Sequence, residues 1–203
     1  MHETAARYTA DEALQRLIDG NARFVRGEAR FPTVQKEILA DLARGQHPYA
    51  TILGCSDSRV PPELVFDAGF GELFIVRVAG NVISHEVMGT LQYAGVHLQT
   101  PLFVVLGHEG CGAVQAALAA RHPDADHPER IARLLENIVP GLRGIDDGLP
   151  ADVQMHRGVE ANVRWAMRQL HETTEVEQRV QEGRMRLVGA VYELETGRVQ
   201  WLG

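Results

Sequence analysis

Four short runs of consecutive apolar residues constrain the fold of this chain more than any other feature. They are the segments 50–54, 73–78, 102–107 and 186–192. Runs that are apolar at successive positions, rather than at alternate ones, are typical of strands covered on both faces, as in a parallel sheet. Helical patterns lie between them, over 85–98, 111–120, 127–140 and 152–181. This repeated order predicts an α/β fold with a mostly parallel central sheet flanked by helices.

Two helical patterns precede the first of these strands. Residues 9–26 carry apolar side chains at helical spacing, and Thr9 followed by Glu12 predicts a capping box at the start. A second helix is predicted over 33–44. Because neither helix has a strand beside it in the sequence, we expect an N-terminal helical arm, residues 1–48, that packs on a partner subunit.

The C-terminal segment is predicted to close the sheet. Residues 195–198 have the composition of a turn, which leads into 199–202 as an antiparallel C-terminal edge strand. Residues 49–203 then form the α/β domain. A chain of 203 residues has the size of one domain overall.

Charge and hydropathy exclude several kinds of partner. The formal net charge of −7 argues against a nucleic acid or an anionic membrane as the main partner. No apolar run is long enough for a transmembrane helix. The first residues lack the basic and apolar regions of a secretory signal, so we expect a cytoplasmic location and reduced thiols.

The two cysteines and one histidine lie where parallel strands end. Cys55 directly follows the first predicted strand, His108 follows the third, and Cys111 begins a predicted helix. Ligands of open α/β sheets bind outside the carboxyl ends of strands, so neighbouring strands would bring these residues together. Two Cys and one His form a catalytic zinc set with an open fourth position, and sulfur favours zinc over Mg²⁺ or Ca²⁺. A disulfide between the cysteines is the alternative.

Asp57 and Arg59 follow Cys55 in the turn that leaves the strand. Asp57 could ligate zinc directly and close its fourth position. It could instead pair with Arg59, which would lower the pKa of the carboxyl group and keep it as a hydrogen-bond acceptor beside the metal. An ion pair that only stabilises the loop is the third interpretation.

Several motifs together resemble the β-class carbonic anhydrases. They are Cys-Ser-Asp-Ser-Arg-Val at 55–60, Gly-Glu-Leu-Phe at 71–74, Arg-Val-Ala-Gly-Asn at 77–81 and Gly-His-Glu-Gly-Cys-Gly-Ala-Val at 107–114. The resemblance extends over roughly residues 20–202, and the order of the paired motifs is highly specific. It includes Leu-Gln-Tyr-Ala at 91–94 and the segment 189–197.

The resemblance implies a carbonate dehydratase, a lyase that reversibly hydrates CO₂ to bicarbonate and a proton by attack of zinc-bound hydroxide. Cys55, His108 and Cys111 would hold one Zn²⁺ per chain. Asp57 and Arg59 would form the catalytic pair, with Asp57 on the metal only in a closed form. The resemblance also implies a homodimer or a higher homo-oligomer with the active site at the dimer interface.

The chain departs from the family pattern at two places. Ile52 stands where some members have a tryptophan that serves bicarbonate regulation, so we do not expect this regulation, although Arg77 is present. Residues 67–70 offer no amide side chain to hold substrate. The backbone N–H of Gly112 or a partner-chain residue is expected to hold it instead. Tyr93 either lines the pocket or packs in the sheet.

The sequence offers one candidate for a proton shuttle and leaves two alternative functions open. His85 is the one candidate for a shuttle. A hydrolase of carbonyl sulfide or carbon disulfide would use the same site. A non-catalytic zinc or thiol module is the alternative from a different class, because structural zinc sites usually have four protein ligands, and Asp57 would be the fourth.

Overall fold

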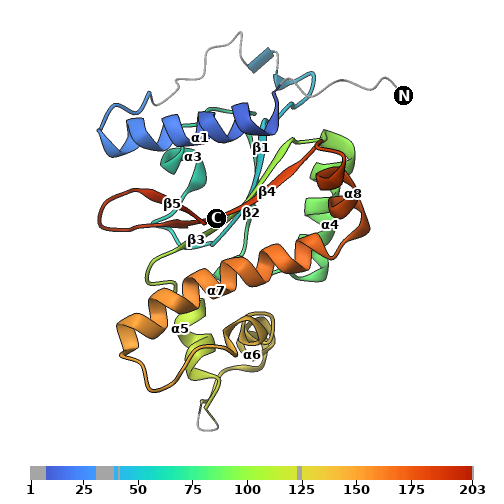
Figure 1. Ribbon diagram of the computed structural model, residues 1–203. Coiled ribbons are helices and arrows are strands. Elements are labelled where there is room, and N and C mark those ends of the chain that lie inside the picture. The colour runs from blue at the N-terminus through green and yellow to red at the C-terminus, as the bar shows by residue number, and fades with distance from the viewer. Residues whose placement is uncertain (1–7, 31–38, 41, 123–124, 203) are drawn as a thin grey trace.

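The computed structural model describes residues 8–30, 39–40, 42–122 and 125–202. It contains a five-stranded sheet in the order β2-β1-β3-β4-β5 (Figure 1). The strands are β1 (Ala50–Gly54), β2 (Leu73–Arg77), β3 (Leu102–His108), β4 (Arg186–Tyr192) and β5 (Val199–Leu202). The first four are parallel, and β5 pairs antiparallel with β4. The predicted α/β sheet and its antiparallel edge strand are confirmed.

Helices cover this sheet and connect its strands. They are α1 (Ala10–Val25), α3 (Pro62–Val65), α4 (His85–Tyr93), α5 (Gly112–Ala119), α6 (Glu129–Leu135), α7 (Ala151–His171) and α8 (Thr174–Gln181). The helix α7 contacts β3 and β4, whereas α1 contacts α3 and β3. Figure 1 shows the strands between α1 and α7. Both sides of the central strands are therefore covered, which explains why β1 and β3 are buried at every position.

The helix α1 packs on its own chain. Thr9 and Glu12 form the predicted capping box, and the side chains of Ala13 and Leu17 are fully buried. Both belong to the main hydrophobic core, together with residues of the strands. The premise that this helix has no sheet of its own to pack on is therefore wrong, whereas its contact with a partner subunit stays a prediction. The boundary of the arm at residue 48 stays a prediction, and the predicted helix over 33–44 lies mostly outside the described residues.

The predicted helix over 152–181 is divided into α7 and α8. Thr173 has extended backbone angles, φ −84° and ψ 131°, and is the residue from which α8 begins. Its hydroxyl donates to the carbonyl of Leu170 at 2.8 Å. Threonine side chains bond to nearby backbone groups in this way and favour helix ends over helix interiors, so the periodic pattern alone overestimated this helix.

Two other helices are shorter than their patterns predicted. The helix α6 stops at Leu135, and a 3₁₀ turn follows over Val139–Leu142 because Pro140 cannot continue an α-helix. The helix α4 ends at Tyr93 and widens into a π-helical turn over Ala94–Leu98. That turn ends at Gln99, which has a left-handed backbone with φ 52°.

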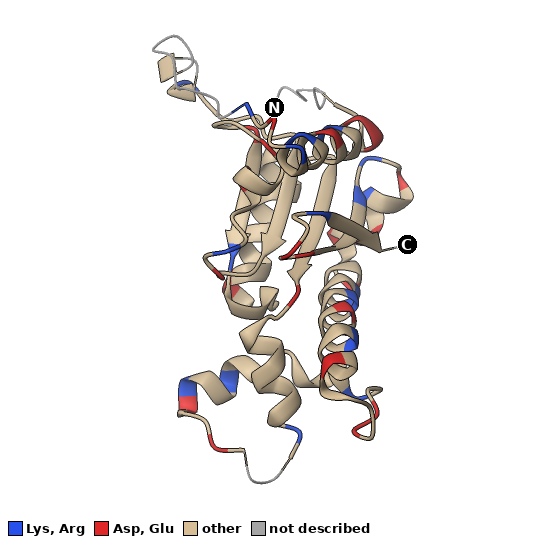
Figure 2. Ribbon diagram, turned by 90° about the vertical axis from the view of Figure 1, so that its left-hand side faces the viewer, with Lys and Arg blue, Asp and Glu red and all other residues tan. Residues whose placement is uncertain are grey.

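Charged residues are frequent along α1 and α7, whereas the strands carry few (Figure 2). Arg186 begins β4 and Arg77 ends β2, so both stand at strand ends rather than in the core. Among the helices formed by the described residues, none has the length and apolar composition required to cross a bilayer.

Candidate metal centre

Three buried residues meet at the carboxyl edge of the sheet. The strands β1 and β3 are neighbours, with Gly54 paired to Leu106. Cys55 follows β1, and His108 is the last residue of β3 rather than the residue after it. Cys111 precedes the first turn of α5. The potential ligand atoms of the cluster Cys55–His108–Cys111 all lie within 4.8 Å of one another.

The imidazole of His108 is oriented by its own turn. Its Nδ1 lies 2.8 Å from the carbonyl oxygen of Glu109, which can only accept, so Nδ1 carries the proton and Nε2 presents a lone pair. The residue is 1% exposed. Among the described residues Nε2 has no hydrogen-bond partner. A buried acceptor without a partner is unfavourable, so the cluster fits a metal ion as the missing partner of Nε2.

The two cysteines are free thiols, which excludes the disulfide. Their sulfur atoms are 4.0 Å apart. The hydrogen bond from Cys111 lowers the pKa of Cys55, and the same bond together with burial raises the pKa of Cys111. These opposite directions fit one proton shared by the two sulfurs. A divalent cation that replaces this proton would hold both sulfurs as thiolates.

Asp57 lies beside the cluster and is held by Arg59. The Arg59 side chain donates from Nε to Oδ1 at 3.0 Å and from Nη2 to Oδ2 at 2.8 Å, and its backbone N–H donates to Oδ1 at 2.9 Å. These bonds from Arg59 hold the pKa of the Asp57 carboxyl well below its usual range. The Oδ2 atom is 3.8 Å from Nε2 of His108. Asp57 is thus an ionised acceptor at the margin of the cluster.

Arg77 has a role that sequence reasoning missed. Its Nε donates to the carbonyl of Cys55 at 2.9 Å, and its Nη2 donates to the carbonyl of Asp57 at 2.6 Å. Arg77 pairs in register with Gly54, the residue before Cys55. A charged residue at the end of an otherwise apolar strand is the sequence signal that could have indicated this contact. Arg77 fixes the backbone of the loop that carries Cys55 and Asp57.

The predicted substrate residues lie in different places. Gly112 is exposed and begins α5 directly after Cys111. Tyr93 is 46% exposed, and its ring lies 6.2 Å from that of Phe74. Phe74 pairs with Thr51, toward the amino end of β1. Within this chain Tyr93 therefore lies away from the carboxyl edge. Its exposure also contradicts the expectation that it packs as a buried residue in the sheet.

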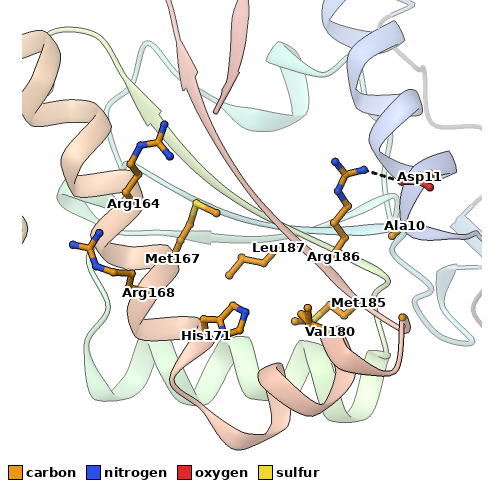
Figure 3. A pocket seen from close by; sticks show the side chains of 11 residues that line it. Ala10, Asp11, Arg164, Met167, Arg168, His171, Val180, Met185, Arg186 and Leu187 are labelled. Atoms are coloured by element: carbon orange, nitrogen blue, oxygen red, sulfur yellow. Dashed lines mark hydrogen bonds and ion pairs between the residues drawn. The ribbon is translucent and has the colours of Figure 1, made fainter. Parts of the chain in front are cut away.

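A cavity of about 680 Å³ lies elsewhere, between the start of α1, the helices α7 and α8 and the strand β4 (Figure 3). Figure 3 shows Met167 and Leu187 in its interior. Arg186 at its rim is paired with Asp11 at 2.7 Å, and Arg168 lies over the ring of Trp165. The cavity shares no residue with the metal cluster, and two of its cations are already engaged.

The fold and the cluster define an α/β protein with a buried Cys₂His cluster, which fits a metal ion, at the carboxyl edge of its sheet. The family model described as carbonic anhydrase matches residues 50–199. Carbonic anhydrase 2 of Mycobacterium tuberculosis is 40% identical over 188 residues, which cover 92% of this chain and 89% of that protein. The carbonic anhydrase of Mycolicibacterium smegmatis is 40% identical over 190 residues, 93% of this chain and 91% of that protein.

Solved structures agree with these relatives. The β-carbonic anhydrase CcaA superposes with a TM-score of 0.78 at 28% identity, over 94% of this chain and 95% of that one. The Coccomyxa β-carbonic anhydrase in complex with acetazolamide has a TM-score of 0.74 at 28% identity, over 93% of this chain and 86% of that one. The chain belongs to the carbonic anhydrase family, and within it to the β class.

Proposed function

We propose that this chain catalyses the zinc-dependent, reversible hydration of CO₂ to bicarbonate and a proton. The observation that carries the proposal is the buried Nε2 of His108, which has no partner among the described residues and lies within 4.8 Å of two thiol sulfurs. Membership of the carbonic anhydrase family supports the substrate.

Cys55, His108 and Cys111 would hold one zinc ion per chain. Zinc prefers sulfur and nitrogen ligands, and two thiolates compensate its charge, so the ion can be bound in a buried cluster. When bound, zinc supplies positive charge and lowers the pKa of a water molecule toward about 7. The bond between Nδ1 of His108 and the carbonyl of Glu109 keeps Nε2 directed at the cluster.

Asp57 and Arg59 would act as the catalytic pair. Arg59 keeps Asp57 ionised, so the carboxylate can accept a hydrogen bond and orient a proton-bearing oxygen beside the cluster. Both carboxylate oxygens accept from Arg59, so ligation of the metal by Oδ2 would compete with the bond from Nη2. The predicted closed form therefore costs at least one charge-assisted hydrogen bond.

The substrate contacts remain proposals. The N–H of Gly112 belongs to the first turn of α5, where backbone donors have no partner within the helix, and it directly follows Cys111. Tyr93 could reach an active site only from a second copy of the chain.

Exposed apolar side chains support a homodimer or a larger homo-oligomer, since Phe70 is 65% exposed and Val96 is 50% exposed. The free thiols support the cytoplasmic location.

Metal content and CO₂ hydration test the proposed function together. We expect one zinc ion per chain by plasma mass spectrometry, and hydration that increases across about pH 6 to 9 in stopped-flow indicator assays. Sulfide release from carbonyl sulfide or carbon disulfide without CO₂ hydration would favour the hydrolase alternative. Stoichiometric zinc with no turnover of any of the three compounds would favour the non-catalytic module.

A further inference from the structure

We infer that Asn162 is a positioning residue of the metal centre, which acts through the backbone of Gly80 on the sulfur of Cys55. The inference rests on the proposed zinc site and concerns a residue of α7 that lies far from the ligands in the sequence.

Two hydrogen bonds connect Asn162 to the cluster. The side chain of Asn162 is buried, with 2% of the residue exposed, and its Nδ2 donates to the carbonyl of Gly80 at 2.8 Å. The backbone N–H of Gly80 donates to Sγ of Cys55 at 3.3 Å. The carbonyl of Gly80 thus accepts from the side chain of Asn162, and the N–H of Gly80 donates to the sulfur of Cys55.

The turn formed by Gly80 and Asn81 needs such support. Gly80 has φ 66° and ψ 19°, and Asn81 after it has φ 44°, so two successive residues are left-handed. A Cβ at Gly80 would lie 2.7 Å from Cδ1 of Ile138 and 3.0 Å from Cβ of Ala113. Gly80 adopts this conformation without strain, but a left-handed non-glycine residue such as Asn81 persists only where the surroundings fix it. The amide of Asn162 and the packing of Ile138 and Ala113 provide that restraint.

The contact matters because an N–H donor stabilises the negative charge on sulfur. A donor held at 3.3 Å from Cys55 fixes the direction of the sulfur and withdraws charge from it. Loss of such an outer contact typically lowers metal affinity about 10- to 100-fold. Without Asn162 the carbonyl of Gly80 would lose its partner and the strained turn could relax, which would move the N–H away from the sulfur.

Two variants of Asn162 and a matched control test the inference in the full chain. Asn162→Ala removes the side chain, and Asn162→Leu keeps most of its volume without a donor. Asn21→Ala is the control, because Asn21 of α1 is also buried and also donates to backbone carbonyls. Its side chain donates to the carbonyl of Val65 at 3.1 Å and to that of Gly197 at 2.9 Å. The measurements are zinc release to a chromophoric chelator and the sulfur-to-cobalt charge-transfer band of the Co²⁺-substituted protein.

We expect both Asn162 variants to release zinc about 10-fold faster or more, with a shifted charge-transfer band, while Asn21→Ala changes neither. If one Asn162 variant does not fold, as judged by circular dichroism, the other carries the test. Unchanged release and an unchanged band in a folded Asn162 variant would overturn the inference, as would equal effects in Asn21→Ala. Failure of the wild-type chain to bind zinc or hydrate CO₂ would instead refute the proposed function.

Discussion

Oδ2 of Asp57 lies 3.8 Å from Nε2 of His108, a separation too long for a hydrogen bond and close enough for both atoms to contact one ion or one water molecule. The carboxylate does not close this gap because Arg59 holds both of its oxygens. The pair Asp57–Arg59 therefore keeps an acceptor beside the cluster without making it a ligand.

Asp57→Asn should lower CO₂ hydration about 100-fold and leave one zinc ion per chain. The amide has only one oxygen that can accept from Arg59. It also lacks the negative charge that would orient a proton-bearing oxygen. Stopped-flow assays and metal analysis measure the two effects. Asp19→Asn, on the exposed face of α1, is the control, and it should retain full activity. Full turnover in Asp57→Asn would remove Asp57 from the mechanism.

Arg59→Gln should reduce turnover and slow the release of zinc. Without the bidentate partner, Asp57 is free to approach the cluster and become a fourth ligand, which favours the closed form. Chelator competition and stopped-flow assays measure the two changes. The double variant Arg59→Gln with Asp57→Asn should lose the slow release, since the added ligand is gone. Faster zinc release in Arg59→Gln would show that Arg59 supports the site in another way.

Zinc should protect both thiols from modification. In the loaded protein we expect neither Cys55 nor Cys111 to react readily with a thiol reagent. Removal of the metal by a strong chelator should make Cys55, whose pKa is lowered, the reactive thiol, whereas Cys111, whose pKa is raised, should react more slowly. Cys55→Ser should lower the zinc content and abolish hydration. Full zinc and full hydration in Cys55→Ser would contradict the ligand set.

Strand ends were predictable from the sequence, whereas the contacts between elements were not. Cys55 and His108 follow apolar runs in a parallel pattern, and that pattern implies a shared edge. Asn162 lies in the middle of a helical pattern, and no local signal shows that its side chain meets Gly80. The same limit applies to Thr173, because the helical pattern over 152–181 continues across the residue from which α8 begins. Long-range hydrogen bonds depend on the packing of α7 against β3, which one sequence does not specify.

Stability should fall at high pH because of Tyr49. Burial, and next the negative charge of Glu72, raise the pKa of Tyr49 to about 12, although Arg16 opposes this shift. The folded state therefore retains the phenol proton above the ordinary pKa of about 10, so stability is full below pH 10 and decreases as pH rises toward 12. Denaturant unfolding should show a loss of about 2 kcal/mol over that interval.

Tyr49→Phe should remove this loss of stability between pH 10 and 12, because phenylalanine has no phenol group to ionise. Tyr93→Phe is the control, since Tyr93 is 46% exposed, and it should retain the wild-type pH dependence. Equal pH curves for wild type and Tyr49→Phe would show that Tyr49 does not cause the decrease.

Two glycines in helices should respond oppositely to alanine. Alanine favours a helix interior by about 1 kcal/mol over glycine. At Gly20 of α1, a Cβ would lie only 1.9 Å from the carbonyl oxygen of Phe66, so Gly20→Ala should push α1 from α3 and destabilise the chain by about 1–3 kcal/mol. At Gly89 of α4, a Cβ would meet none of the described atoms within 4 Å, so Gly89→Ala should stabilise it. Denaturant unfolding of both variants measures the difference, and stabilisation by Gly20→Ala would contradict the close approach of α1 to α3.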